Sequence, residues 1–80
     1  MNSSPDGEEL DLSGLKCPLP ALMTARALKR LRPGALLTVT VTDPLAPLDI
    51  RFLCKREGHE FVRQSGSTSD NPVHIVLRRK

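Results

Sequence analysis

The chain has 80 residues, a formal net charge of +3, two cysteines and only two aromatic residues, both phenylalanine. This length favours one small domain, and no apolar run approaches the roughly 20 residues of a membrane-spanning helix, so we expect no membrane association. Two distant cysteines do not make a disulfide scaffold, and the polar, acidic first residues do not resemble a secretory signal. These features predict a cytoplasmic protein.

The charge is distributed unevenly along the chain. Residues 1–11 carry four acidic side chains and no basic one, whereas residues 12–80 carry all twelve lysines and arginines against five acids. Such a positive field attracts nucleic acid or an acidic protein surface. Proteins that bind single strands stack bases on exposed aromatic rings, but Phe52 and Phe61 both lie in apolar patterns that predict burial. We therefore expect an acidic protein partner and no direct nucleic-acid binding.

The first part of the chain predicts a strand and a helix. We expect residues 1–8 to be a disordered leader and residues 9–80 to form a single domain. A short strand is expected at 9–12, followed by a turn at Ser13-Gly14. Residues 18–31 predict an amphipathic helix that ends at Pro33-Gly34. Its expected apolar stripe is made of Ala21, Leu22, Ala25, Leu28 and Leu31.

The rest of the chain predicts a strand, one more helix and two further strands. Alternating threonine and apolar residues predict a strand at 36–42, and residues 45–57 predict a helix that stops at Gly58. The expected apolar face of this helix consists of Leu45, Leu48 and Phe52, broadened by Ile50, Leu53 and Cys54. Two strands at 59–64 and 73–79 flank a polar loop at 65–72.

The order of elements predicts the fold class. Each helix shows one apolar stripe, so both can cover the same face of one sheet. We predict an α+β protein, a two-layer α/β sandwich of order β-α-β-α-β-β, whose four-stranded mixed sheet has two helices on one face. The first two strands should be parallel if they are neighbours, and the last two should form a hairpin.

Cys17 is the candidate functional residue, because it lies where the first strand passes into the first helix. Pro18 is well suited to the first helical position, and Pro18 and Pro20 stiffen this entry. The unpaired N–H groups at the helix start and the charge of Lys16 favour the thiolate, the reactive form of cysteine. A thiolate held there can accept, carry and surrender a sulfur atom. The alternative is that Cys17 is a small buried hydrophobic residue.

Other roles for the cysteines and histidines are weaker. Cys54 lies on the apolar face of the second predicted helix, which favours core packing. A Cys17–Cys54 disulfide conflicts with a reducing compartment. A metal site made of Cys17, Cys54, His59 and His74 matches no common zinc spacing. We expect no metal and no cofactor other than sulfur bound covalently to Cys17.

The first helix also carries a basic face. Arg26 and Lys29 lie with Arg30 and Arg32 outside the expected apolar stripe. This face is either a docking surface for a protein that approaches Cys17 or an ordinary solvated surface.

One motif connects the chain to a known family. The segment Gly14-Leu15-Lys16-Cys17-Pro18-Leu19-Pro20 follows Leu10-Asp11 and precedes Pro33-Gly34. Further matches are Asp43-Pro44, Asp49-Ile50, and Phe52 to Cys54 ahead of Gly58-His59-Glu60. From about Leu10 to Arg79 the sequence resembles the TusA/SirA-like family of small sulfur-carrier proteins.

This resemblance implies a function for the motif. It implies the sandwich fold described above and a persulfide on Cys17, with Pro18 and Pro20 as the rigid frame and Gly14 and Lys16 as supporting residues. It also implies a sulfurtransferase that acts as a stoichiometric relay. The implied donor is a cysteine desulfurase or a rhodanese, and the implied acceptor is a protein of tRNA thiolation, molybdenum-cofactor maturation or sulfur oxidation.

Two other functions remain open from the residues. A regulatory binding module would use Arg26 and Lys29 to bind a protein or RNA partner, and its binding would not need Cys17. A small structural domain would carry Cys17 without using it. For a carrier that meets its partners transiently, we expect a monomer.

Overall fold

The computed structural model describes residues 7–66 and 72–80. Residues 1–6 of the predicted leader and residues 67–71 of the predicted loop lie outside these ranges, whereas residues 7 and 8, also predicted to be disordered, belong to the first strand. The elements, in chain order, are β1 (Gly7–Leu12), α1 (Leu19–Arg30), β2 (Leu36–Val41), α2 (Ala46–Glu57), β3 (Glu60–Ser65) and β4 (Val73–Arg78). The predicted order is confirmed, and each boundary lies within two residues of its prediction.

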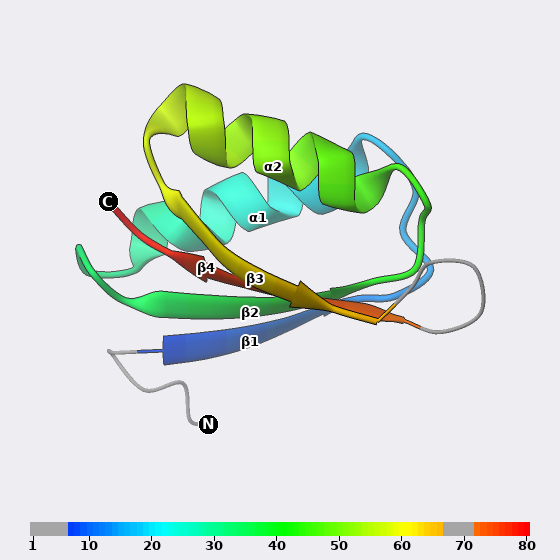
Figure 1. Ribbon diagram of the computed structural model, residues 1–80, viewed down its shortest axis with the longest axis horizontal. Helices are drawn as coiled ribbons and strands as arrows, with labels where there is room; N and C mark the ends of the chain where they lie inside the picture. The colour runs from blue at the N-terminus through cyan, green and yellow to red at the C-terminus, as the bar shows by residue number, and fades with distance from the viewer. Residues whose placement is uncertain (1–6, 67–71) are drawn as a thin grey trace.

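The strands form one sheet in the order β1-β2-β4-β3. β1 is parallel to β2, and β4 is antiparallel to both of its neighbours, β2 and β3. Both helices cover the same face of this sheet (Figure 1). The predicted two-layer α+β sandwich with a mixed sheet is therefore confirmed.

Most of the buried side chains of the sheet belong to the two central strands, β2 and β4. Their apolar residues alternate with polar ones, so that one face of each strand is apolar. The fully buried side chains of β2 and β4 are Leu37, Val39, Val41, Val73, Ile75 and Leu77. Val39 and Ile75 are directly paired across the two strands. This apolar face is the surface on which the helices pack.

The buried stripe of α1 differs from the predicted one. The helix buries Pro20, Thr24, Ala27 and Leu28, whereas Leu22 is 54% exposed. At 3.6 residues per turn, Leu22 lies about 120° round the helix from Leu28, so the two leucines cannot share one face. The prediction that Leu28 and Leu31 lie in the core is confirmed, whereas the same prediction for Leu22 was wrong. Thr24 is accommodated there because its hydroxyl donates to the carbonyl oxygen of Pro20 at 2.7 Å.

The buried stripe of α2 agrees with the prediction only in part. Ile50, Leu53 and Cys54 are buried as predicted, together with Ala46. The expected line of large side chains faces solvent instead, with exposed fractions of 56% for Leu45, 52% for Leu48 and 61% for Phe52. Phe52 lies about 160° round the helix from Ile50, on the side opposite the sheet. The prediction that Phe52 is buried was wrong.

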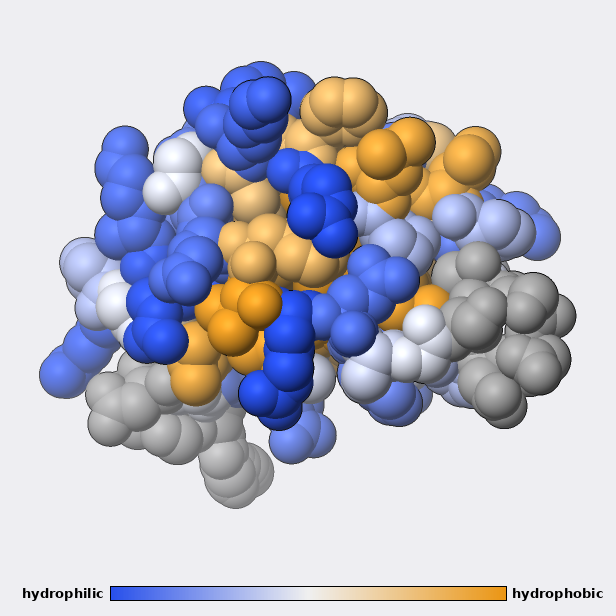
Figure 2. Space-filling view, viewed as in Figure 1, coloured by the Kyte–Doolittle hydropathy of each residue, from blue (hydrophilic) through white to orange (hydrophobic). Residues whose placement is uncertain are grey.

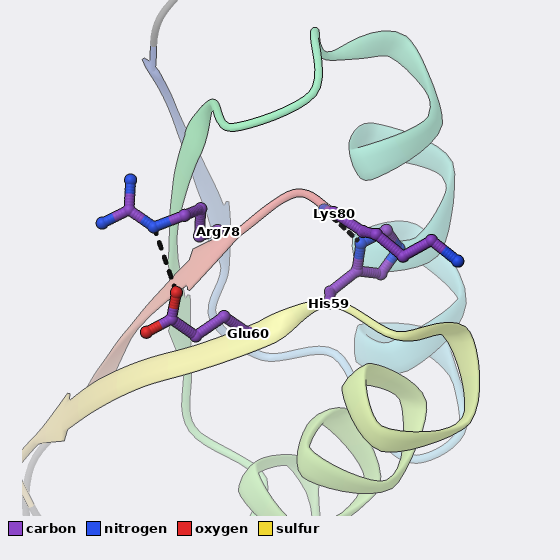
Figure 3. Close-up of polar contacts among 4 residues, drawn as sticks. All are labelled: His59, Glu60, Arg78 and Lys80. Atoms are coloured by element: carbon purple, nitrogen blue, oxygen red, sulfur yellow. Dashed lines mark hydrogen bonds and ion pairs between the residues drawn. The ribbon is translucent and has the colours of Figure 1, made fainter.

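The C-terminal end of the chain ties the sheet to both helices. Arg79 Nε donates to the carbonyl oxygen of Leu28 at 2.6 Å, which satisfies a carbonyl in the last turn of α1. The backbone N–H of Lys80 donates to His59 Nδ1 at 3.0 Å, just after α2, and Arg78 Nε pairs with Glu60 Oε1 at 3.1 Å (Figure 3). The contacts of Arg79 and Lys80 hold the C-terminal ends of α1 and α2 to the end of β4, and the contact of Arg78 joins β4 to β3.

Two leucines of α1 provide a test of this packing. We expect Leu28→Ala to lower the free energy of unfolding by about 2–4 kcal/mol, because it leaves a cavity in the core. Leu22→Ala should lower it by less than about 1 kcal/mol, because Leu22 is mostly in water. Urea unfolding at neutral pH measures both values. Equal losses in the two variants would contradict the observed orientation of α1.

Candidate functional site

The loop between β1 and α1 is fixed against the end of β2. Gly14 has a φ of +84°, a conformation that favours glycine. Its N–H donates to Thr42 Oγ1 at 2.8 Å, immediately after β2. The predicted turn at Ser13-Gly14 therefore brings the loop that carries Lys16 and Cys17 to the C-terminal edge of the parallel strands.

Asp43 holds the backbone of Cys17. One carboxylate oxygen of Asp43 accepts the N–H of Cys17 at 2.6 Å, and the other accepts the N–H of Leu45 at 2.9 Å. The bond from Leu45, then the bond from Cys17, lower the pKa of Asp43, with a smaller contribution from the charge of Lys16. A single carboxylate thus connects the start of α2 to the segment that precedes α1.

A second carboxylate holds the sulfur itself. The Cys17 thiol donates to Asp49 Oδ2 with an Sγ–Oδ2 distance of 2.7 Å. This hydrogen bond, followed by desolvation and the negative charges of Asp49 and Asp43, raises the pKa of Cys17. The expectation that the surroundings of Cys17 favour the thiolate was therefore wrong. The two acids that approach from the β2–α2 segment outweigh Lys16 and the helix start.

The start of α1 is one residue later than predicted. The helix begins at Leu19, and Pro18 is the residue before it rather than the first helical residue. The Leu19 N–H already donates to the Lys16 carbonyl at 2.8 Å, and the Leu22 N–H donates to the Pro18 carbonyl at 3.2 Å. Two of the N–H groups expected to support an anion at Cys17 are therefore occupied. The Cys17–Pro18 peptide bond is cis, and Pro20 is buried in the first turn.

Cys17 lies exposed at a groove between the two helices. The groove has a volume of about 360 Å³, and Cys17, Ala21, Leu22, Asp49 and Phe52 are among its lining residues. Figure 2 shows hydrophobic side chains gathered over the N-terminal half of α2, where Leu48 and Phe52 are exposed. Contiguous exposed apolar side chains of this kind are typical of sites for protein or ligand contact.

The predicted basic residues do not line this groove. Arg26 and Lys29 are both exposed on α1, but the basic residue at the groove is Arg56 of α2. Lys29 instead lines a neighbouring cavity of about 440 Å³ at the C-terminal ends of the helices, together with Arg56, Arg79 and Lys80. The structure therefore separates Arg26 and Lys29 from the lining around Cys17.

The other cysteine lies in the core. Cys54 is 2% exposed, and desolvation raises its pKa to about 11. The prediction that it serves in packing is confirmed.

His74 is exposed on β4, on the face of the sheet away from the helices, and its Nδ1 lies 3.0 Å from Thr40 Oγ1. Within residues 7–66 and 72–80, no group of three or more His, Cys, Asp and Glu side chains is placed to hold a metal ion.

Sequence reasoning missed the two aspartates as partners of Cys17. Asp43 and Asp49 lie 26 and 32 residues away along the chain. Both belong to segments, Asp43-Pro44 and Asp49-Ile50, whose only signal in the sequence is the family resemblance. Their approach to Cys17 depends on β2 lying beside β1 and on the first turn of α2, which sequence spacing alone does not show.

Comparisons with known proteins agree on one family. The family model described as sulfurtransferase TusA matches residues 8–79. A protein of Neisseria meningitidis serogroup A with a provisional sulfur-carrier name is 40% identical over 75 residues, which cover 94% of this chain and 99% of that protein. The sulfur carrier protein TusA of Pseudomonas aeruginosa is 46% identical over 55 residues, covering 69% of this chain and 70% of that protein.

A solved structure matches the fold. The crystal structure of a SirA-like protein from Desulfitobacterium hafniense superposes with a TM-score of 0.76 at 18% sequence identity, covering 88% of this chain and 93% of that one. Among the described residues, no helix has the length and apolar character needed to cross a membrane.

The two cysteines should differ in reactivity. In the folded protein at pH 8, we expect iodoacetamide to modify Cys17 while Cys54 stays unmodified, because Cys54 is buried and mostly protonated below a pKa of about 11. Peptide mass spectrometry after timed alkylation distinguishes the two sites. In urea both should react, and fast labelling of Cys54 without urea would contradict its burial.

The hydrogen bonds to Asp43 should appear in the acid stability. The native pKa of Asp43 lies below its ordinary value of 3.8, so its stabilising effect is complete above about pH 4 and is lost as the pH falls through the native value. Asp43→Asn should therefore lose less of its stability between pH 5 and pH 2.5 than the wild type. Urea midpoints at both pH values measure this, with the exposed Glu9→Gln as a control. A wild-type pH dependence in Asp43→Asn would refute the role of this carboxylate.

Proposed function

Because the chain belongs to the TusA family of sulfurtransferases, we propose that it carries sulfur as a persulfide on Cys17 and delivers it to a protein acceptor. The observation that supports this proposal most directly is the exposed Cys17 thiol at the mouth of an apolar groove. Cys54 is buried, so it is not accessible to a donor.

The proposed reaction needs little from the carrier beyond a presented sulfur. A thiolate attacks the outer sulfur of a donor persulfide, and the inner donor sulfur leaves as a thiolate, as in thiol–disulfide exchange. The acceptor then repeats the attack on the sulfur held by Cys17. The protein gains and loses one sulfur atom in each cycle and requires no metal or bound cofactor. It is therefore a stoichiometric relay rather than an independent turnover enzyme.

The motif residues have separate proposed roles. Gly14 permits the turn that directs the loop toward β2, and its N–H is held by Thr42. Pro18 lines the groove beside Cys17, and Pro20 anchors the first turn of α1 in the core. Lys16 supplies a positive charge next to the sulfur and close to Asp43. Together they hold the thiol at the surface.

The donor and acceptor are proposed from the family resemblance. A cysteine desulfurase or a rhodanese in the cytoplasm would load Cys17. The acceptor would belong to tRNA thiolation, molybdenum-cofactor maturation or sulfur oxidation. The exposed side chains of Leu22, Leu48 and Phe52 supply apolar area that either partner can bury during contact. A carrier that meets two partners in turn is expected to be monomeric between these encounters.

A regulatory binding module is the second candidate function. The cavity lined by Lys29, Arg79 and Lys80, and by Arg56 in an ion pair with Glu57, gives this alternative a surface with a net positive charge apart from Cys17. Binding of an acidic partner there would weaken with salt and would not need the thiol. Arg26, which does not line this cavity, would contribute only through the general positive field.

Sulfur loading can be measured directly by mass. We expect the wild-type protein to gain one sulfur atom after incubation with a cysteine desulfurase and cysteine, or with a rhodanese and thiosulfate. Intact mass spectrometry under non-reducing conditions detects this gain, and a reductant should remove it. Cys17→Ser should not load, because it lacks the accepting sulfur, whereas Cys54→Ser should load like the wild type.

Two outcomes would redirect the assignment. Loading that persists in Cys17→Ser and disappears in Cys54→Ser would contradict the choice of cysteine. No loading from either donor, together with salt-sensitive partner binding that survives Cys17→Ser and is lost in Lys29→Ala, would favour the binding module. Circular dichroism of each variant confirms that the fold is intact.

A further inference from the structure

The carrier function alone assigns no role to the contact between Cys17 and Asp49. Asp49 lies in the first turn of α2 and is half-buried at the groove. Its Oδ2 is 2.7 Å from Cys17 Sγ, which is the atom that must react. Helix α2 is anchored in the core by Ala46 and Ile50, so its first turn is held in place beside the sulfur.

The other charged groups near the sulfur have different tasks. Asp43 uses its two carboxylate oxygens to accept the N–H groups of Cys17 and Leu45. Lys16 lies next to Cys17 in the loop, and Arg56 enters the groove lining from the last turn of α2. The residues that α1 contributes to the lining are Ala21, Leu22 and Ala25, which carry no charge. Among these groups, Asp49 is the one whose side chain is hydrogen-bonded to the thiol.

Resting on the proposed carrier function, we propose that Asp49 is a positioning residue that keeps the unloaded Cys17 sulfur oriented and protonated until a donor persulfide reaches the groove. A thiolate at this position would stand beside the Asp49 carboxylate at hydrogen-bond distance, and two like charges so close are unfavourable. The neutral thiol, in contrast, donates to that carboxylate. The free carrier therefore reacts slowly with small oxidants and alkylating agents.

The loading step balances without an added oxidant or reductant. A bond forms between Cys17 Sγ and the outer sulfur of the donor persulfide, and the sulfur–sulfur bond of the donor breaks. The electron pair of that bond leaves with the donor cysteine as a thiolate. The Cys17 proton is lost as Sγ attacks, so that Sγ reacts as a thiolate. The donor thiolate, which is a stronger base than a carboxylate, takes up that proton. The net change is Cys17 thiol plus donor persulfide to Cys17 persulfide plus donor thiol.

The same carboxylate acts differently on the loaded carrier. Once Sγ is bonded to a second sulfur it has no proton to donate, so the hydrogen bond to Asp49 is lost. The outer sulfur bears the negative charge of an ionised persulfide and is repelled by Asp49 and Asp43. The transferable sulfur is thereby directed away from the first turn of α2 and toward solvent, where an acceptor approaches.

The pH dependence of Cys17 alkylation tests this proposal. Asp49→Asn keeps the shape of the side chain and removes its charge. We expect its alkylation midpoint to move to lower pH than in the wild type. A shift of one pH unit would raise the alkylation rate at pH 7 about threefold, because a tenfold gain in thiolate is partly offset by its lower nucleophilicity. Mixed-disulfide formation with oxidised glutathione at pH 7 should accelerate similarly.

Controls separate the contact from general charge effects. Glu9→Gln removes the same charge from β1 and should leave the midpoint unchanged. Asp49→Glu retains the charge and should restore a midpoint above that of Asp49→Asn. Asp49→Ser carries the same expectation as Asp49→Asn, so the test stands if one of the two fails to fold. Thermal unfolding of each variant identifies such a failure.

The result that overturns the proposal is an unchanged or higher alkylation midpoint in the folded Asp49→Asn or Asp49→Ser variant. An equal shift in Glu9→Gln would also overturn it, because net charge and not contact would then be the cause. These measurements use no sulfur donor. Their failure is therefore distinct from failure of the carrier function, which would appear as no mass gain in the wild type.

Discussion

The two hydrogen bonds accepted by Asp43 are the constraint on which the site depends. They join the N–H of Cys17, before α1, to the N–H of Leu45, before α2. The entries of both helices are thereby fixed to one carboxylate at the end of β2. Two further bonds attach the loop from Gly14 to Pro18 to the same region, one from the Gly14 N–H to Thr42 and one from the Cys17 thiol to Asp49. The bonds to Asp43 add a fixed backbone position for Cys17, so that its sulfur is held near Asp49 by more than the thiol bond alone.

Some electrostatic effects favour ionisation of the Cys17 thiol and others oppose it. The distances from the sulfur to the charged groups decide which effect is stronger. A helix start and a neighbouring lysine favour an anion, but both effects weaken quickly with distance and solvent exposure. The Asp49 carboxylate touches the thiol at 2.7 Å, while the helix N–H groups of Leu19 and Leu22 are bonded elsewhere. Direct contact therefore outweighs the more diffuse positive field. Cys17 is presented to partners as a neutral thiol, and its reactivity depends on what approaches it.

The sequence was sufficient for the sheet and the position of Cys17 but not for the orientation of the helices. A strand has a period of two, so alternation in Leu36–Val41 and Val73–Arg78 leaves only one apolar face to bury. A helix with apolar residues over a wide arc offers two faces, and the larger side chains were assigned to the core. In α2 the smaller Ala46 and Cys54 pack against the sheet, whereas Phe52 faces outward. The partners of Cys17 were missed for a different reason, since Asp43 and Asp49 approach it only through tertiary structure.

The same two helix faces explain how a small protein combines stability with recognition. The inner face of α2 contributes Ile50 and Leu53 to the core, and the outer line of Leu45, Leu48 and Phe52 is left for contact. Because these faces lie on opposite sides of one rigid helix, a change in the outer line need not disturb the packing that fixes Asp49. Partner choice can then vary through the exposed side chains, while Asp43 and Asp49 set the chemistry at Cys17. This separation follows from the helical period and from the anchoring of α2 on the sheet.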